Sequence, residues 1–306
     1  MIPLIFAQPH NTQVAEFLSS EDLANSFSKQ LNGEIANFEI RNFPDGETYI
    51  RVLSNCLNRD IIILANLHQP NSKLLPLIFL CDILKEMDCN KITLIAPYLP
   101  YMRQDIQFHP GEAVTSRFFA KLLSQQIDHL ITIDPHLHRY HSLSQIYSCE
   151  TSVIQANPAI ADWIKKNIKK PFIVGPDNES EQWAANVANM IDCPYLILDK
   201  QRFGDKDVSV SASSAEEFKG LTPVLIDDII STGRTMVKTA EWLANEGLCP
   251  PICIGVHALF SGDALAVMKQ AKIEKVLTCS TIAHETNQIE VSNLLIQAYQ
   301  EITTSN

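Results

Sequence analysis

Short runs of apolar residues alternate with amphipathic segments along most of the chain. An apolar run bounded by turn-forming residues predicts a buried strand, and apolar residues that recur every three or four positions predict a helix. The strands expected from this pattern are 61–67, 92–96, 130–134, 172–175, 195–199, 224–228, 252–256 and 276–280. The helices expected are 12–31, 72–87, 115–126, 158–168, 179–190, 235–245 and 291–300.

This alternation predicts an α/β fold with doubly wound, mostly parallel sheets. A chain of 306 residues exceeds the usual size of one domain, and the expected elements divide into two similar halves near residue 150. We therefore predict an N-terminal domain of residues 1–150 and a C-terminal domain of residues 151–306. Between a strand and a helix of the first half, residues 103–114 predict a long loop, the position where open α/β sheets bind ligands.

The charge and composition disfavour several classes of protein. The formal net charge of -11 argues against a nucleic-acid partner, because such a partner needs a basic face that displaces counterions from phosphates. No apolar run approaches the roughly 20 residues that span a bilayer, and residues 1–7 lack the length and basic flank of a secretory signal. The eight cysteines are spread singly, which favours neither disulfides nor a tetrathiolate zinc site. We therefore expect a cytoplasmic protein without a membrane partner.

The segment 224–235 carries the strongest chemical signal in the chain. It reads VLIDDIISTGRT, an apolar strand with two adjacent acids and then a hydroxyl-rich turn that opens a helix. Hydroxyl and N–H groups at a helix start can hold a phosphate, and two carboxylates can accept hydrogen bonds from neighbouring sugar hydroxyls. Acids and Ser-Thr-Gly turns also cap helices without binding any ligand. Helix capping is a sufficient explanation for the two acids alone. It explains the complete strand, acid pair and Ser-Thr-Gly turn less well, and the complete segment therefore favours a sugar-phosphate site.

This segment resembles the phosphoribosyl pyrophosphate (PRPP) signature of type I phosphoribosyltransferases and PRPP synthetases. The resemblance implies the type I phosphoribosyltransferase fold for both halves of the chain. It also implies that Asp227 and Asp228 bind the 2- and 3-hydroxyls of ribose while the turn holds the 5-phosphate. The residues implied for the phosphate are Ser231, Thr232, Gly233 and Thr235. Arg234 departs from the signature, which usually has a small residue at that position.

A second segment separates synthetases from transferases that only consume PRPP. Residues 43–47 read FPDGE, which by itself predicts a hairpin turn between two extended runs. The segment resembles the Phe-x-Asp-Gly-Glu of PRPP synthetases. There the aromatic ring packs on adenine and the two acids bind the base or ribose, commonly across a subunit boundary. The resemblance implies that Phe43, Asp45 and Glu47 bind ATP, and that the protein is a homo-oligomer whose ATP site is shared between subunits.

The predicted loop of residues 103–114 supplies a third match. Arg103, Gln104 and Asp105 resemble the Arg-Gln-Asp of PRPP synthetases, a segment that contacts ATP, and a guanidinium suits this role because its planar fork can bind phosphate oxygens or stack on a base. A surface salt bridge is the simpler interpretation of an arginine beside acids. The family usually has basic residues next, whereas this chain has residues 106–109 with the sequence IQFH.

Two strand-terminal motifs imply a magnesium ion. His136 ends an Asp-Pro-His motif that resembles the family's Asp-x-His beside the ATP phosphates, and Asp177 ends a Gly-Pro-Asp motif that resembles the acid near the metal. The resemblance implies Mg²⁺ as the cofactor, with His136 and Asp177 near it. The group of His136, His138 and His141 also suits zinc, but His138 and His141 lie beyond the expected strand end. Magnesium prefers oxygen and water ligands and needs few protein ligands.

The remaining match lies near residue 200. Asp199, Lys200, Gln201 and Arg202 resemble the family's Asp-Lys-x-Arg at the root of a catalytic loop. The resemblance implies that Lys200 and Arg202 are catalytic and stabilise charge on the transferring diphosphate.

Six matches in the expected order between residues 43 and 235 imply a ribose-phosphate pyrophosphokinase. Such an enzyme transfers the β,γ-diphosphate of ATP to the C1 hydroxyl of ribose 5-phosphate, giving PRPP and AMP, so that ATP and ribose 5-phosphate are the expected substrates. Two alternatives remain open. One is a phosphoribosyltransferase that consumes PRPP, and the other is a catalytically weak regulatory homologue of the synthetase, which the departures at Arg234 and residues 106–109 favour.

Overall fold

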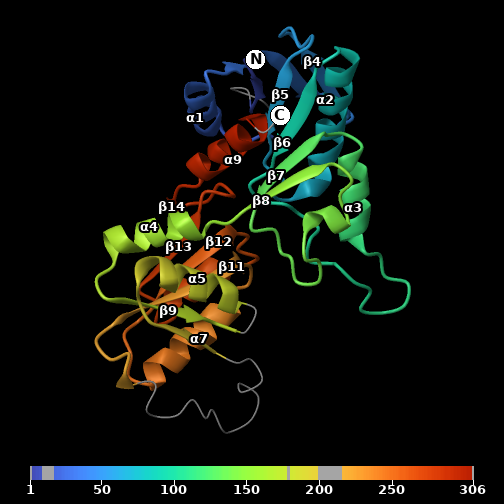
Figure 1. The fold of residues 1–306 in the computed structure, drawn as a ribbon. Helices are drawn as coiled ribbons and strands as arrows, with labels where there is room; N and C mark the ends of the chain where they lie inside the picture. The colour runs from blue at the N-terminus through green and yellow to red at the C-terminus, as the bar shows by residue number, and fades with distance from the viewer. Residues whose placement is uncertain (1, 9–16, 178–179, 199–215, 305–306) are drawn as a thin grey trace. The chain divides into compact units, whose positions relative to one another are not determined.

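The computed structural model describes residues 2–8, 17–177, 180–198 and 216–304. The chain forms two compact units, which are coloured by residue number in Figure 1. The first unit is Met1–Ile154 together with Ser292–Asn306, and the second unit is Gln155–Val291. Lys200 and Arg202, the residues that the sequence assigns to catalysis, lie outside the described residues.

The first unit is built on a six-stranded parallel sheet in the order β2-β1-β5-β6-β7-β8. The strands are β1 (Leu4–Phe6), β2 (Glu34–Ile35), β5 (Asp60–Leu64), β6 (Lys91–Ile95), β7 (His129–Ile133) and β8 (Glu150–Ile154). Its helices are α1 (Glu21–Leu31), α2 (Leu74–Glu86), α3 (Thr115–Ser124) and α9 (Ser292–Thr304), with short 3₁₀ turns at Pro70–Ser72 and Leu143–Gln145.

Helices cover both faces of this sheet, with α1 and α9 on one face and α2 and α3 on the other (Figure 1). The inner strands are therefore buried along nearly their whole length rather than at alternate positions, and every residue of β1 and β7 is buried. The edge strands β2 and β8 are more exposed. The last helix of the chain, α9, packs on α1, β7 and β8. The Gln30 amide of α1 donates a hydrogen bond to Asn293 Oδ1 of α9 at 2.8 Å.

The hairpin of β3 (Phe38–Asn42) and β4 (Thr48–Val52) is a separate antiparallel pair in the first unit. Residues on β3 alternate between buried and exposed, because successive side chains of a strand point to opposite faces. The buried face packs on the unit's core, where the Phe38 and Phe6 rings lie 5.3 Å apart. The other face of the hairpin is exposed.

The second unit has a six-stranded parallel sheet in the order β10-β9-β11-β12-β13-β14. The strands are β9 (Pro171–Gly175), β10 (Tyr195–Ile197), β11 (Thr222–Ile230), β12 (Ile252–Ala258), β13 (Lys275–Cys279) and β14 (Asn287–Ile289). The helices are α4 (Asn157–Asn167), α5 (Glu181–Ile191), α7 (Arg234–Asn245) and α8 (Ala264–Gln270).

The two sheets share one topology. In each, the unit's first strand lies between its second strand and the next strand of the sheet, and the remaining strands follow in chain order. The prediction of two similar α/β domains with mostly parallel central sheets is confirmed. One strand is longer than expected: β11 runs to Ile230 because residues beyond the acid pair continue to pair with β12.

Two expectations about composition can be compared with this fold. Among the described residues, no helix combines the length and the apolar character that a membrane span requires. All eight cysteines lie in the described part of the chain, and all are free thiols.

Candidate functional site

The acid pair of the second unit lies near the carboxyl end of β11, between neighbouring strands β9 and β12. Asp227 is partly exposed, whereas Asp228 is only 7% exposed. The backbone N–H of Asp228 donates a hydrogen bond to Asp227 Oδ1 at 3.0 Å, which fixes the first carboxylate against the strand. Because ligands of open α/β sheets bind beyond the carboxyl ends of the strands, the pair lies where such a site is expected.

A third carboxyl group acts on this pair. Asp177 follows β9, the strand beside β11, and is 5% exposed. The pKa of Asp227 is raised well above its ordinary value, first by burial and then by the charges of Asp228 and Asp177. Neighbouring carboxylates repel one another when all of them are ionised. A cation or several hydroxyl donors would relieve that repulsion.

The turn after β9 holds Asp177 in place. Asp177 Oδ1 accepts a hydrogen bond from the backbone N–H of Ser180 at 3.1 Å, and the Ser180 hydroxyl donates to the carbonyl of Asp177 at 2.6 Å. An aspartate that bonds to the backbone of its own turn is a common way of opening a helix, and α5 begins at Glu181. The Gly-Pro-Asp motif is thus a structured turn with an acid at the edge of the sheet.

The turn between β11 and α7 has the backbone shape of an anion site. Gly233 precedes α7 with φ 69° and ψ -5°, a left-handed conformation that glycine adopts without strain. A Cβ at this position would lie 2.8 Å from both Cγ and Sδ of Met268, so that any side chain here would have to displace Met268. The N–H groups of the first turn of a helix lack intrahelical partners and attract anions. Arg234 and Thr235 open the helix, and Thr232 and Arg234 are exposed.

Ser261 contacts this turn but was not predicted from the sequence. It follows β12, and its backbone N–H donates to the carbonyl of Ser231 at 2.9 Å. The two hydroxyl oxygens lie 3.2 Å apart. Gly262, which follows with φ 63°, turns the chain there. A Ser-Gly pair in the loop after β12, the strand beside β11, is the signal that could have identified this residue.

The predicted ATP residues of the hairpin lie at its tip. The backbone N–H of Phe43 donates to the carbonyl of Glu47 at 2.7 Å, and Gly46 N–H donates to the carbonyl of Phe43 at 2.9 Å. Asp45 Oδ1 accepts a hydrogen bond from Glu47 N–H at 3.3 Å. The segment therefore forms the predicted turn, and it also leaves Phe43 40% exposed, with the Asp45 and Glu47 residues exposed beside it.

The Arg-Gln-Asp segment divides into one exposed and two anchored side chains. Arg103 is exposed in the loop between β6 and α3. Gln104 Oε1 accepts a hydrogen bond from the Thr115 hydroxyl at 3.1 Å. Asp105 is 6% exposed, and its Oδ1 lies 3.4 Å from Arg139 Nε. Gln104 and Asp105 thus fix the loop to its surroundings, and Arg103 is the member whose side chain faces solvent.

The loop continues into residues that a single acid organises. Glu112 Oε2 accepts hydrogen bonds from the backbone N–H groups of Phe108 and His109, at 2.7 and 3.0 Å. Its Oε1 lies 2.8 Å from His109 Nδ1, and these contacts, with the His109 side chain first, lower the pKa of Glu112. The segment without the family's basic residues is therefore held by hydrogen bonds to one carboxylate.

His136 follows β7, the strand beside β6. Its Nδ1 lies 3.1 Å from His138 Nε2, and the two ring centroids are 3.7 Å apart. The Arg103 loop and His136 thus extend from the carboxyl ends of two neighbouring strands of the first unit. The predicted residues fall into two groups, one in each unit: the ribose-phosphate residues and Asp177 in the second, and the ATP residues and His136 in the first.

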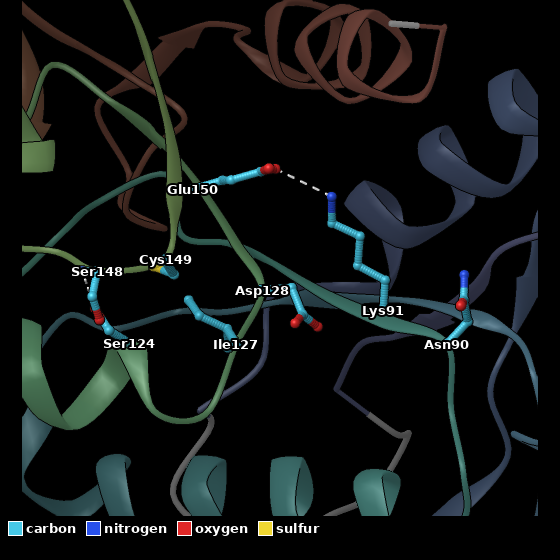
Figure 2. A pocket seen from close by; sticks show the side chains of 8 residues that line it. All are labelled: Asn90, Lys91, Ser124, Ile127, Asp128, Ser148, Cys149 and Glu150. Carbon is cyan, nitrogen blue, oxygen red and sulfur yellow. Dashed lines mark hydrogen bonds and ion pairs between the residues drawn. The ribbon is translucent and has the colours of Figure 1, made fainter. Parts of the chain in front are cut away.

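A separate hollow of about 540 Å³ lies at the amino-terminal ends of β6, β7 and β8. Figure 2 shows its polar lining, in which Lys91 points toward Glu150 and Asp128 lies between neighbouring strands. Lys91 Nζ is 3.2 Å from Glu150 Oε2, so this cation is already paired. Among the described residues, none that the sequence assigns to the site lines this hollow.

Two family models match the chain. Residues 12–126 match the N-terminal domain of ribose phosphate pyrophosphokinase. Residues 142–293 match the phosphoribosyl transferase domain. The first match contains the hairpin and the Arg103 loop, and the second contains the acid pair and the glycine turn.

Known proteins resemble the chain over nearly its whole length. A ribose-phosphate pyrophosphokinase of Sulfolobus acidocaldarius is 33% identical over 267 residues, which cover 86% of this chain and 91% of the relative. One from Methanobrevibacter smithii is 29% identical over 295 residues, covering 92% of this chain and 98% of the relative. The crystal structure of phosphoribosylpyrophosphate synthetase from Mycobacterium smegmatis superposes on this chain with a TM-score of 0.82 and 20% identity, and the superposition covers 100% of both chains. At that identity the structural match concerns the fold.

Proposed function

Because the chain belongs to the ribose-phosphate pyrophosphokinase family, we propose that its two units divide the substrates of the family's reaction between them. The enzyme transfers the diphosphate of ATP to the C1 hydroxyl of ribose 5-phosphate, giving PRPP and AMP. The second unit binds ribose 5-phosphate, and the first unit binds ATP. The observation that carries this division is the acid pair of β11 followed by the glycine turn at the start of α7.

In the second unit, the carboxylates of Asp227 and Asp228 accept hydrogen bonds from the 2- and 3-hydroxyls of ribose. The 5-phosphate lies in the turn against the first N–H groups of α7, with the hydroxyls of Ser231, Thr232 and Thr235. The N-terminus of a helix carries a partial positive charge, so a cationic side chain at the first helical position is unfavourable unless an anion binds beside it. Arg234 occupies that position, and a bound phosphate provides the anion that makes a guanidinium favourable.

In the first unit, the base of ATP stacks on Phe43 while Asp45 and Glu47 accept hydrogen bonds from the base or its ribose. Arg103 binds phosphate oxygens or stacks on the base. Gln104 and Asp105 act through the loop that they anchor, and their interactions hold Arg103 in place. A cytoplasmic enzyme without a nucleic-acid partner is consistent with the acidic chain and its free cysteines.

Mg²⁺ is the proposed cofactor, with His136 and Asp177 near it. The acids of the second unit fit a divalent cation, because the pKa of Asp227 is raised by burial and then by the charges of Asp228 and Asp177, and a cation would offset the repulsion among these carboxylates. Magnesium prefers oxygen ligands and keeps several waters, so Asp177 suits direct binding and His136 suits contact through water. When bound, the ion neutralises charge on the diphosphate.

The reaction forms a bond between O1 of ribose 5-phosphate and the β-phosphorus, and it breaks the bond from that phosphorus to the oxygen that AMP retains. The enzyme's contribution to such a transfer is chiefly positioning and stabilisation of charge on the nonbridging oxygens. The acid pair and the glycine turn hold both ends of the sugar and thereby aim its C1 hydroxyl. Lys200 and Arg202, outside the described residues, are proposed to stabilise the charge.

The exposed tip of the hairpin supports a further part of the proposal, a homo-oligomer in which Phe43 contributes to the ATP site of a neighbouring subunit. Closed homo-oligomers with rotational symmetry are the usual form of such assemblies. Sedimentation velocity of the active enzyme should give a dimer or a larger closed assembly. A fully active monomer would contradict the shared site but not the reaction.

The reaction itself is tested by product analysis. Purified enzyme given ATP, Mg²⁺ and ribose 5-phosphate should form PRPP and AMP in equal amounts, followed together by chromatography, and chelation of Mg²⁺ should abolish both. Lys200→Ala is the matched control, because it should bind ribose 5-phosphate normally and lose turnover by on the order of 10²-fold. A regulatory homologue would bind ribose 5-phosphate and form neither product. A transferase would form no AMP and would consume added PRPP.

A further inference from the structure

The exposed face of the β3–β4 hairpin carries an ordered group of side chains. The antiparallel register places Arg41 directly opposite Tyr49, and Phe43 follows Arg41 two residues later on the same face. The opposite face, with Phe38 and Ile40, is buried in the core of the first unit. Burial therefore fixes the hairpin from one side and leaves the other side available for a ligand.

The three side chains on the exposed face form one stack. The guanidinium carbon of Arg41 lies 4.7 Å from the centroid of the Phe43 ring and 4.2 Å from the centroid of the Tyr49 ring. The two rings are 6.0 Å apart and nearly perpendicular, at 87°. Cations within about 6 Å of an aromatic centroid are attracted by the ring quadrupole. Arg41 thus contacts both rings and links Tyr49 on β4 to Phe43 at the tip of the hairpin.

This stack is additional to the contacts between the two strands and to the contacts of the hairpin with the core. Five residue pairs and the buried face already hold the two strands together. An exposed phenylalanine beside a turn would otherwise exchange freely among its rotamers. Contacts of Phe43 with Arg41 on β3 and with Tyr49 on β4 restrict that exchange. A ring that is already oriented binds a planar partner with a smaller loss of conformational entropy.

We propose that Arg41 and Tyr49 are positioning residues for the nucleotide, which orient the Phe43 ring so that it stacks on the purine base. The inference rests on the proposed function of Phe43 in ATP binding. The Tyr49 ring supports the guanidinium, and the guanidinium supports the Phe43 ring. The aromatic ring of Tyr49 is the part that matters, because the guanidinium lies against that ring.

The consequence is a selective effect on nucleotide affinity. Arg41→Met keeps a long side chain but removes the charge, and Tyr49→Leu removes the ring, so each should raise KM for ATP about fivefold, the factor that one exposed cation–π contact corresponds to. Both should leave kcat and KM for ribose 5-phosphate within about twofold of wild type, since neither residue contacts the reacting atoms. Tyr49→Phe keeps the ring and should retain the wild-type KM.

The hairpin offers a matched control. Arg51 lies on the same exposed face, opposite Glu39 and farther from the tip, with its Nη1 3.8 Å from Glu39 Oε2. Arg51→Met removes the same charge from the same surface and should leave KM for ATP unchanged. Thermal unfolding of every variant is measured beside the kinetics, so that a general loss of stability is recognised.

Phe43→Leu separates failure of the inference from failure of the proposed function. The variant should raise KM for ATP, and adding Arg41→Met to it should give little further increase, because the two residues act through one contact. The positioning role is overturned if Phe43→Leu raises KM for ATP whereas Arg41→Met and Tyr49→Leu do not. It is also overturned if Arg51→Met raises that KM as much as Arg41→Met does. In both cases the role of Phe43 in ATP binding stands. If Phe43→Leu leaves KM unchanged while PRPP is still formed, ATP binding at Phe43 is overturned, and with it the inference.

Discussion

Replacing Asp227 with asparagine should stabilise the ligand-free enzyme while removing most of its activity. The substitution removes one of three adjacent charges, and the asparagine oxygen can still accept the hydrogen bond from the N–H of Asp228. We expect the free energy of unfolding to rise by about 0.5–2 kcal/mol, the usual gain when a strained functional site is relieved. Hydrogen bonds to a charged group contribute about 1.5–3 kcal/mol, so kcat/KM for ribose 5-phosphate should fall roughly 10- to 100-fold.

The pH dependence of stability gives this prediction a sign. The raised pKa of Asp227 means that the folded protein binds this proton at pH values where the unfolded chain has released it. The stability contributed by the group is complete below the ordinary pKa of 3.8 and is lost as pH rises through the raised value. Wild type should therefore lose stability in that window, and Asp227→Asn should lose less.

Thermal unfolding and steady-state kinetics of the same preparations check both effects. Glu241→Gln is the control, because it neutralises an exposed acid on α7 in the same unit. It should change neither the unfolding nor KM for ribose 5-phosphate appreciably. A less stable Asp227→Asn, or one with wild-type kcat/KM, would contradict the assignment of the acid pair.

Gly233→Ala should have the second large effect, on both stability and the binding of ribose 5-phosphate. The alanine would adopt a positive φ and place its Cβ 2.8 Å from Met268, which is completely buried and cannot move into solvent. Left-handed backbone costs roughly 1–2 kcal/mol for a residue with a Cβ, and an overpacked core typically costs about 1–3 kcal/mol more. Distortion of the turn should raise KM for ribose 5-phosphate on the order of tenfold, which corresponds to about 1.4 kcal/mol.

Gly247→Ala separates the two costs. Gly247 has φ 75° and no atom within 4 Å of the added Cβ, so its substitution strains only the backbone. Denaturant unfolding should give a lower free energy of unfolding for Gly233→Ala than for Gly247→Ala. Only Gly233→Ala should weaken the binding of ribose 5-phosphate in calorimetric titrations. Equal losses of stability with unchanged binding would mean that the shape of the turn does not matter for the phosphate.

The sequence predicted the elements whose signal is local. Buried parallel strands are apolar throughout, and the string from Val224 to Thr235 contains a strand, a turn and a helix start in consecutive residues. The Phe43 turn is local for the same reason. The length of β11 was not predicted, because its last residues pair with β12 and that partner is more than twenty residues away in the chain.

Interactions between distant residues were beyond the sequence. The ion pair of Asp105 with Arg139 joins the loop before α3 to the segment after β7. The sequence motif resembles an ATP contact, and it does not show that the Asp105 carboxylate is held by this distant arginine. Ser261 lies next to Ser231 only because β12 is adjacent to β11. The amphipathic pattern of α9 likewise predicts a helix but does not specify that it packs with α1.

The fate of the β-phosphorus of ATP tests the central claim most directly. Enzyme, Mg²⁺ and ribose 5-phosphate are incubated with ATP labelled at that phosphorus, and the products are separated by chromatography. Transfer of the intact diphosphate predicts that the label appears in PRPP while unlabelled AMP accumulates in equal amount. Label that remains in ADP would show ordinary transfer of the γ-phosphoryl group and would contradict the account.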